Sequence, residues 1–366
     1  MAWRYLERMR RDGNQTGSRR IAVAGRRLRR TPLALALFAV VMVLVTAVNH
    51  AVLADNPLTF PGTLLALLGS PAIRSGNPSA PELPGLPGLV TEVHAVTVDG
   101  ARRTYRSITP ARVTDHLPLV IVLHGRGQSG SVAASQTGFL GLAQRWQAVL
   151  VFPDGERRSW DAGHGCCGFA GAHRVPDVPF VAAIVADAEH RWSVDAERVY
   201  LVGYSNGGKL AYSAVCAHPT FFAAVATYGA VPLAPCPAGT PAVPYLLAAG
   251  AADRVLPFHG KPGGHPPLPA VPRAVDWLRV QDGCPASAQT GRDGSVVLQR
   301  WAGCAGGAEV DSVVYPGWGH PWPAARTSTA SPSVATLMWS FLSRHERVIT
   351  RPAPPRPAAG KVHKHP

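Results

Sequence analysis

The chain has few charged residues for its length of 366 residues. Asp, Glu, Lys and Arg make up 16% of it, against 46% hydrophobic residues. Disordered chains show the opposite balance, so this composition excludes disorder as the main state and allows a sizeable core. The 37 glycines and 35 prolines follow no Gly-X-Y period, which excludes a collagen-like chain.

Cysteine is absent from the first 165 residues and never occurs as a CxxC pair. The first absence excludes a lipoprotein anchor near the N-terminus, and the second argues against a zinc cluster. The six cysteines that are present predict disulfides in an exported domain. Among the possible connectivities we favour three local pairs: Cys166–Cys167, Cys216–Cys236 and Cys284–Cys304.

Positive charge is concentrated at the two ends of the chain. The net charge is +14, and residues 1–32 contain ten arginines but only two acidic residues. Residues 348–366 form a basic, proline-rich tail that we expect to be disordered. A nucleic-acid-binding domain carries its basic residues on the folded face, so we expect no nucleic-acid partner.

An uncharged apolar segment, residues 33–54, follows the arginine block directly. Arginines stay on the cytoplasmic side of a membrane, so residues 1–32 are expected there and the rest of the chain outside. Two interpretations remain open: an uncleaved transmembrane anchor, which we favour, or a signal peptide cleaved near Ala54. Residues 55–88 contain seven prolines and predict a semi-rigid linker.

Residues 89–347 predict one α/β domain. Leu117–Leu123 is a continuous apolar run, which is typical of a buried central strand. A hairpin is expected over 93–108, further strands at 148–152, 199–202, 223–228, 245–249 and 310–315, and helices at 131–146, 177–192, 207–217 and 334–342. This alternation predicts a mostly parallel central sheet with helices on both faces.

The motif Gly203-Tyr204-Ser205-Asn206-Gly207 has the form G-x-S-x-G between a predicted strand and a predicted helix. Such a turn lifts the serine hydroxyl above the sheet, where backbone N–H groups at the helix start can bind an oxyanion. The same residues, extended to Lys209, also match a phosphate-binding loop. That loop needs Ser or Thr next, but residue 210 is Leu, which argues against an NTPase.

A nucleophilic serine on this fold needs an acid and a histidine after it in the chain. Asp253 and His320 each follow a predicted strand, and so form the expected triad with Ser205. We assign the oxyanion donors to the backbone N–H groups of Arg126 and Asn206. No metal or cofactor is required.

Three tryptophans lie in loops beside these motifs and are candidate substrate contacts, with packing as the alternative. They are Trp160, Trp318 and Trp322.

Six segments occur in a characteristic order: LHGRGQ, WDAGHGCCG, VPDVPF, GYSNGGKLAY, AADRVLPFHG and GWGHPWP. Over residues 92–345 the chain resembles the exported poly(3-hydroxybutyrate) depolymerase-like esterases of the α/β-hydrolase superfamily, which include feruloyl and acetyl xylan esterases. The resemblance implies the same three catalytic residues and a Cys-Cys-Gly loop near the site. The sequence departs from the family at VPDVPF, where Asp177 stands alone instead of in an Asp-Asp pair.

These observations predict an exported serine esterase that hydrolyses polyhydroxybutyrate-type, feruloyl or acetyl esters and has no obligate protein partner. Two alternatives remain open. One is a serine peptidase on the same fold, and the other is a non-catalytic, wall-associated binding protein that keeps the fold.

Overall fold

The computed structural model describes residues 87–112, 116–323 and 332–347. The predicted cytoplasmic segment, the apolar segment 33–54, almost all of the linker and the basic tail lie outside these ranges. Within them, no helix has the length and apolar character needed to cross a bilayer.

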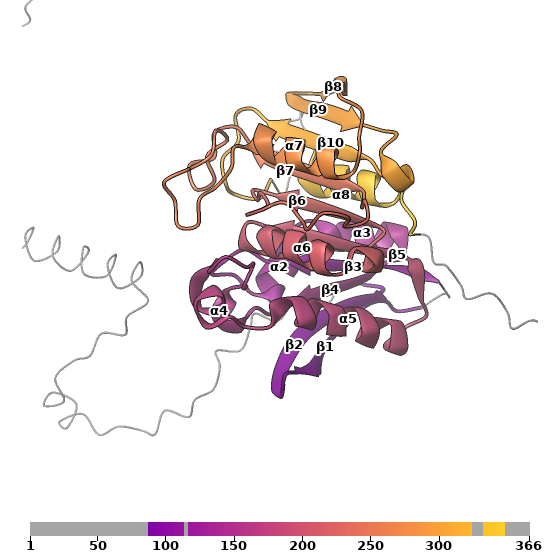
Figure 1. Ribbon diagram of the computed structural model, residues 1–366. Coiled ribbons are helices and arrows are strands. Elements are labelled where there is room, and N and C mark those ends of the chain that lie inside the picture. The colour runs from indigo at the N-terminus through magenta and orange to yellow at the C-terminus, as the bar shows by residue number, and fades with distance from the viewer. Residues whose placement is uncertain (1–86, 113–115, 324–331, 348–366) are drawn as a thin grey trace, which may run out of the picture. The chain divides into compact units, whose positions relative to one another are not determined.

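Ten strands form one sheet (Figure 1). They are β1 (Leu89–Val98), β2 (Ala101–Pro110), β3 (Leu117–Leu123), β4 (Val149–Pro153), β5 (Val194–Tyr204), β6 (Ala224–Tyr228), β7 (Tyr245–Gly250), β8 (Gln289–Asp293), β9 (Val296–Trp301) and β10 (Val310–Tyr315). Their order is β1-β2-β4-β3-β5-β6-β7-β10-β9-β8. The central strands from β4 to β10 are parallel, which confirms the predicted mostly parallel sheet.

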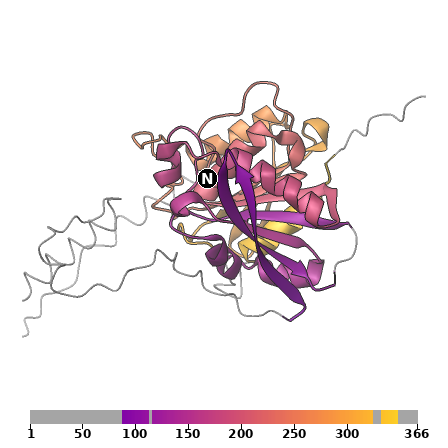
Figure 2. The same cartoon turned by 90° about the horizontal axis from the view of Figure 1, so that it is seen from below.

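Antiparallel strands flank this parallel centre on both sides. The β1–β2 hairpin pairs with β4 at one edge, where Figure 2 shows it nearest the viewer, and the β9–β8 hairpin extends β10 at the other. The strand β3 is entirely buried, as its apolar run predicts.

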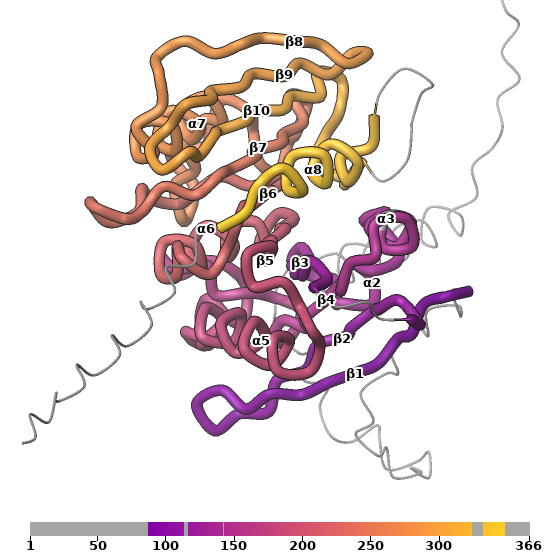
Figure 3. The backbone as a smooth tube through the Cα atoms, turned by 90° about the vertical axis from the view of Figure 1, so that its right-hand side faces the viewer, coloured from indigo at the N-terminus to yellow at the C-terminus, as the bar shows by residue number. Residues whose placement is uncertain are grey.

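Helices cover both faces of the sheet, again as predicted (Figure 3). The helices are α2 (Gly130–Gln136), α3 (Phe139–Trp146), α4 (Gly168–His173), α5 (Asp177–Arg191), α6 (Asn206–Ala217), α7 (Val271–Gln281) and α8 (Val334–Leu342). Buried side chains of α5, α6 and α7 pack into one hydrophobic cluster, and those of α2, α3 and α8 pack into a second. The sheet separates these two clusters, so the domain has three layers.

Several features of the fold differ from the sequence prediction, among them the helices α4 and α7, which were not predicted. The helix expected over 131–146 is divided into α2 and α3, because Gly138 adopts a φ of 81° between them. The hairpin β8–β9 was not predicted, and all residues of β8 are exposed, so no apolar alternation marks it.

The three cysteine pairs expected from the sequence are present as disulfides: Cys166–Cys167, Cys216–Cys236 and Cys284–Cys304. Within the described part of the chain, no cysteine is free. The second disulfide connects the end of α6 to the loop after β6, and the third connects the segment after α7 to the segment after β9.

Candidate active site

Ser205 lies on a sharp turn between β5 and α6, with φ 52° and ψ −115°. Few non-glycine residues adopt such a backbone conformation, and those that do concentrate at functional sites. A Cβ atom on Gly207 would lie 2.5 Å from the backbone oxygens of Leu123 and His124, and one on Gly203 would lie 2.5 Å from the Cα of Gly208. The two glycines of the motif therefore allow the close packing that this turn requires.

The side chains of Ser205, His320 and Asp253 form a hydrogen-bonded chain. His320 Nε2 lies 2.8 Å from Ser205 Oγ, and His320 Nδ1 lies 2.7 Å from Asp253 Oδ2. The other oxygen of Asp253 accepts the backbone N–H groups of Val255 and Leu256, each at 2.8 Å. The structure thus brings together the three residues predicted from the sequence, with the buried carboxylate fixed in orientation.

The three residues meet because their strands end at the same edge of the sheet. Ser205 follows β5, Asp253 follows β7, and His320 follows β10, and these strands are parallel neighbours with only β6 between β5 and β7. In open α/β sheets the carboxyl ends of the strands are the usual place for a functional site.

Two tyrosines hold the loop that carries His320. Tyr204 Oη donates to the backbone oxygen of His320 at 3.1 Å, and Tyr228 Oη donates to that of Gly319 at 2.6 Å. The Tyr204 ring also lies against the imidazole of His320, with 5.4 Å between the ring centroids. A Cβ atom on Gly229, which has a φ of 59°, would lie 3.3 Å from that imidazole. Sequence reasoning missed these tyrosines, although Tyr204 stands directly before Ser205.

The loop after β3 brings the Arg126 backbone toward this site. Hydrogen bonds from Gly127 N to Arg158 O and from Gln128 N to Gly125 O fix the loop. Among the described hydrogen bonds, none has the Arg126 N–H as donor, and Asn206 is the first residue of α6, where N–H groups have no partner within the helix. Both N–H groups remain available to an oxyanion, and both residues line the cavity beside Ser205.

His124 supports this loop without taking part in the triad. Its Nδ1–H donates to Gly125 O at 2.8 Å, and its Nε2 accepts from Gly155 N at 3.0 Å. Burial lowers the pKa of His124 to about 4, because the charged imidazolium would lose its hydration. The ring is therefore neutral at physiological pH, in agreement with a structural role.

Trp160 is fully buried and cannot stack on a substrate, so its prediction as a substrate contact is wrong. Its indole N–H donates to His124 O at 2.8 Å, and its backbone exchanges two hydrogen bonds with the Asn206 side chain, at 2.8 and 3.0 Å. These contacts attach the loop that contains Cys166 and Cys167 to the start of α6. Of the two interpretations of this tryptophan, substrate contact and packing, the structure supports packing.

Trp318 and Trp322 lie in the same loop as His320, but neither lines the cavity beside Ser205. The Trp322 indole N–H donates to Thr137 O at 3.0 Å, and its ring packs against Tyr204 and Tyr228. The Trp318 indole N–H donates within the loop to Pro321 O. In this structure both tryptophans support the loop, and substrate contact by either stays a prediction.

Asp177 in the VPDVPF segment is buried and paired. One of its carboxylate oxygens accepts from Arg103 Nη2 at 2.7 Å, and the other accepts from Asp161 N at 2.7 Å. Burial raises the pKa of Asp177 to about 6, although Arg103 acts in the opposite direction. This single aspartate therefore holds the Cys-Cys-Gly loop against the start of α5.

A cavity of about 360 Å³ lies beside Ser205. Its lining residues come from the loop after β3, the Cys-Cys-Gly loop, α6 and the loop between β7 and α7: Arg126, Gly165, Cys166, Cys167, Gly168, Ser205, Asn206, Lys209, Val255, Lys261, Gly264, His265, Pro266 and Leu268. The Cys166–Cys167 disulfide is thus part of the wall of the site, as the resemblance implies.

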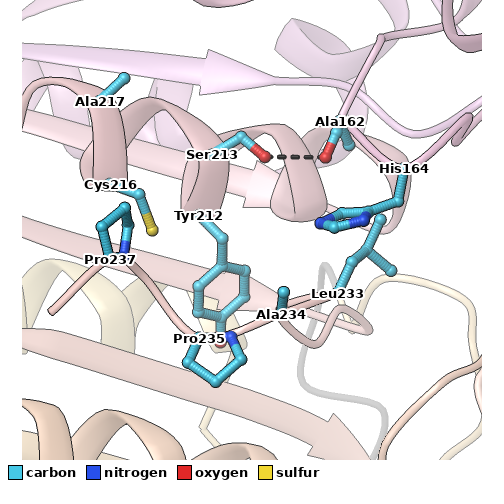
Figure 4. Close-up of a pocket in the computed structure, with 10 residues that line it drawn as sticks. All are labelled: Ala162, His164, Tyr212, Ser213, Cys216, Ala217, Leu233, Ala234, Pro235 and Pro237. Atoms are coloured by element: carbon cyan, nitrogen blue, oxygen red, sulfur yellow. Dashed lines mark hydrogen bonds between the residues drawn. The ribbon is translucent and has the colours of Figure 1, made fainter.

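A second cavity, of about 520 Å³, lies between α6 and the loop after β6 (Figure 4). Figure 4 shows the Ser213 hydroxyl donating to the carbonyl oxygen of Ala162, at 2.8 Å, on the side where His164 stands. A third cavity shares His164 with this one and His265 with the cavity beside Ser205. The three cavities are therefore neighbours that share lining residues.

Comparisons with known proteins agree with an esterase. A family model described as esterase PHB depolymerase matches residues 104–255. NocK from Nocardia uniformis subsp. tsuyamanensis, assigned to the esterases, is 29% identical over 260 residues, which cover 64% of this chain and 74% of NocK. A protein of Aspergillus niger assigned as feruloyl esterase C is 27% identical over 287 residues, which cover 76% of this chain and 96% of that protein.

The fold is also found among solved structures. The acetyl xylan esterase from Aspergillus awamori superposes with a TM-score of 0.51 at 12% identity, over 69% of this chain and 99% of that enzyme. At this identity the similarity concerns the fold, and it agrees with the α/β-hydrolase architecture described above.

Proposed function

The chain belongs to the poly(3-hydroxybutyrate) depolymerase-like and feruloyl esterase-like α/β-hydrolases and is a carboxylic ester hydrolase, and we propose that it acts through an acyl-enzyme on Ser205. The observation that carries the proposal is the position of His320, whose two ring nitrogens lie within hydrogen-bond distance of Ser205 and Asp253. A nucleophile, a base and a group that orients the base are the parts that acyl transfer needs.

In the first half-reaction, His320 Nε2 takes the proton of Ser205 Oγ as this oxygen attacks the ester carbonyl carbon. Asp253 keeps the Nδ1–H of the ring pointing toward itself and stabilises the imidazolium that forms. The backbone N–H groups of Arg126 and Asn206 donate to the oxyanion of the tetrahedral intermediate. The alcohol then leaves with the proton held by His320, and the acyl group stays on Ser205.

In the second half-reaction, water takes the place of the alcohol. His320 removes a proton from the water as it attacks the acyl carbon, and then returns a proton to Ser205 Oγ as the carboxylic acid leaves. The chain supplies the nucleophile, the acid–base group and the oxyanion donors of this cycle, and water is the second substrate. We propose acetyl, feruloyl and short hydroxyacyl esters as the substrate range, supported by the names of the similar enzymes.

We also propose that the catalytic domain works outside the cytoplasm. Three disulfides in the described residues support this, because such bonds persist in oxidising compartments. The apolar segment 33–54 after the arginine block supports it as well, and whether that segment is a cleaved signal or an anchor stays a prediction.

Labelling with a fluorophosphonate tests the nucleophile. The full-length chain, produced in an oxidising compartment, is treated with the reagent, and the adduct is located by mass spectrometry. We expect the adduct on Ser205, and a fall in kcat for p-nitrophenyl acetate of about a thousandfold or more in Ser205→Ala.

Ser213→Ala is the matched control, because Ser213 lies two turns further along α6 and donates to a backbone carbonyl. It should keep both labelling and turnover. Full activity in a folded Ser205→Ala protein, or an adduct at another residue, would overturn the proposed mechanism.

A further inference from the structure

The cavity beside Ser205 carries positive charge from three directions. Arg126 comes from the loop after β3, Lys209 from α6, and Lys261 from the loop between β7 and α7. None of the described residues that line this cavity is Asp or Glu. A site with cations on several walls and no carboxylate attracts negatively charged ligands.

Lys209 has no strong acceptor of its own. Its Nζ lies 3.8 Å from Cys166 Sγ and 3.9 Å from Cys167 Sγ, and disulfide sulfur is a weak acceptor. In the described part of the chain, no carboxylate pairs with Lys209, Arg126 or Lys261. A half-buried ammonium that is left without a counter-ion costs free energy, and a bound anion would offset that cost.

The position of Lys209 relates this charge to the reaction. Ser205 and Lys209 are four residues apart at the start of α6, and the N–H of Lys209 donates to Ser205 O at 3.1 Å. Ser205 itself precedes the helix with a non-helical backbone, but both residues line the same cavity of about 360 Å³. One ligand in this cavity can therefore present an anionic group to Lys209 and an ester group to Ser205.

The electrostatics of Lys209 agree with this geometry. Burial, together with the positive charge of Arg126, lowers the pKa of Lys209 to about 8. The ammonium form still predominates at neutral pH, and a negative charge in the cavity would favour it further.

We propose that this cavity selects esters that carry a carboxylate close to the scissile bond, and that Lys209 is the specificity-determining residue. A carboxylate suits the site because an ammonium and a guanidinium can both donate to its two oxygens. The inference rests on the proposed function, since it assumes that the ester reacts at Ser205.

Two pairs of substrates that differ in one charge test the proposal. The first pair is 4-acetoxybenzoate and its methyl ester, which place the charge on the leaving alcohol. The second pair is mono-p-nitrophenyl adipate and p-nitrophenyl methyl adipate, which place it on the acyl group. Values of kcat/KM are measured with the full-length chain at pH 7 and low ionic strength.

We expect the charged member of at least one pair to be preferred about tenfold to a hundredfold, the range given by a hydrogen bond to a charged group. The pair that shows the preference identifies which part of the substrate occupies the cavity. In Lys209→Met, the kcat/KM of the charged substrate divided by that of its neutral partner should fall at least tenfold. Arg292→Met, which removes an exposed cation from β8, is the matched control and should leave the ratio unchanged.

Other results have distinct meanings. Turnover without a charge preference in either pair, or a preference that Lys209→Met retains, overturns this inference and leaves the proposed function intact. No turnover of any ester by the folded chain, and no fluorophosphonate adduct, overturns both. If Lys209→Met does not fold, Lys261→Met takes its place, and an unchanged ratio in that variant counts against the proposal.

Discussion

The hydroxyl groups of Tyr204 and Tyr228 position the loop that carries His320. The Tyr228 hydroxyl connects the end of β6 to Gly319 O, so it fixes the backbone directly before the histidine. The backbone oxygen of Tyr228 accepts the Ser205 N–H at 3.0 Å, whereas its hydroxyl acts on the backbone beside His320, so the hydroxyl has a positioning role. Burial raises the pKa of its phenol well above the usual value, so the hydroxyl stays protonated and can donate across the working pH range.

We predict that Tyr228→Phe lowers kcat for p-nitrophenyl acetate by about threefold to tenfold while KM changes little. A neutral hydrogen bond contributes about 0.5–1.5 kcal/mol, and here it serves the alignment of the base. Tyr200→Phe is the control, because this buried tyrosine also donates to a backbone carbonyl, that of His345, which lies outside the His320 loop. A kcat that falls equally in both variants would show that general packing is responsible.

The residues of the triad could be predicted from the sequence because their order and their places after apolar strands are local signals. The tyrosines could not, since their role depends on which backbone lies opposite them after folding. Trp160 gave a false signal for a related reason. We expect an aromatic residue in a predicted loop to be exposed, but Trp160 is covered by its own loop and by Phe180 of α5.

At the scale of elements, the turn from β5 to α6 places the strongest demand on packing. Gly207 lies in the first turn of α6 directly against the backbone of the residues that end β3. Gly141 is also helical, in α3, but no atom lies within 4 Å of the place where its Cβ would be. The same substitution should therefore have opposite effects at the two positions.

We predict that Gly207→Ala lowers the free energy of unfolding by about 1–3 kcal/mol and lowers esterase activity, because the new methyl group displaces the turn. Gly141→Ala should raise the free energy of unfolding by about 0.5–1 kcal/mol through the higher helix propensity of alanine, with no change in activity. Urea denaturation and ester hydrolysis of the two variants give the test. A stabilised Gly207→Ala protein would contradict the tight contact with the end of β3.

Most elements with strong apolar patterns were predicted, and α7 is an exception. The helix α7 was missed although its buried residues Val271, Ala274, Val275 and Leu278 have helical spacing, because they stand after a long proline-rich loop. The division of 131–146 into α2 and α3 depends on the conformation of one glycine, which the apolar pattern does not reveal. These differences do not affect the site, which the central strands position.

At the scale of the whole molecule, one buried carboxyl group connects stability to pH. Asp282 ends α7 and is 2% exposed, and burial raises its pKa from 3.8 to about 7. An acid whose pKa is higher in the folded state takes up a proton on folding. Its contribution is therefore favourable at low pH and is lost as the pH rises toward 7.

We predict that Asp282→Asn raises the free energy of unfolding at pH 8 by up to about 4 kcal/mol, because the amide is uncharged at every pH. At pH 5 the gain should be smaller by about half or more, since the wild-type carboxyl is then protonated in the folded state. Guanidinium denaturation at the two pH values measures this, with Asp276→Asn, a more exposed acid on the same helix, as the control. An equal gain at both pH values would mean that Asp282 stays ionised in the folded protein.

The attachment of the His320 loop through its backbone has a consequence for laboratory evolution. The tyrosines bind carbonyl oxygens, which every amino acid provides, and a Cβ atom added at Gly317 or Gly319 would lie 3.6 Å or more from its neighbours in the fold. The histidine can keep its place while its neighbours mutate. Libraries randomised at these two glycines should therefore retain many active members and offer new specificities, whereas libraries at Tyr204 or Tyr228 should retain few.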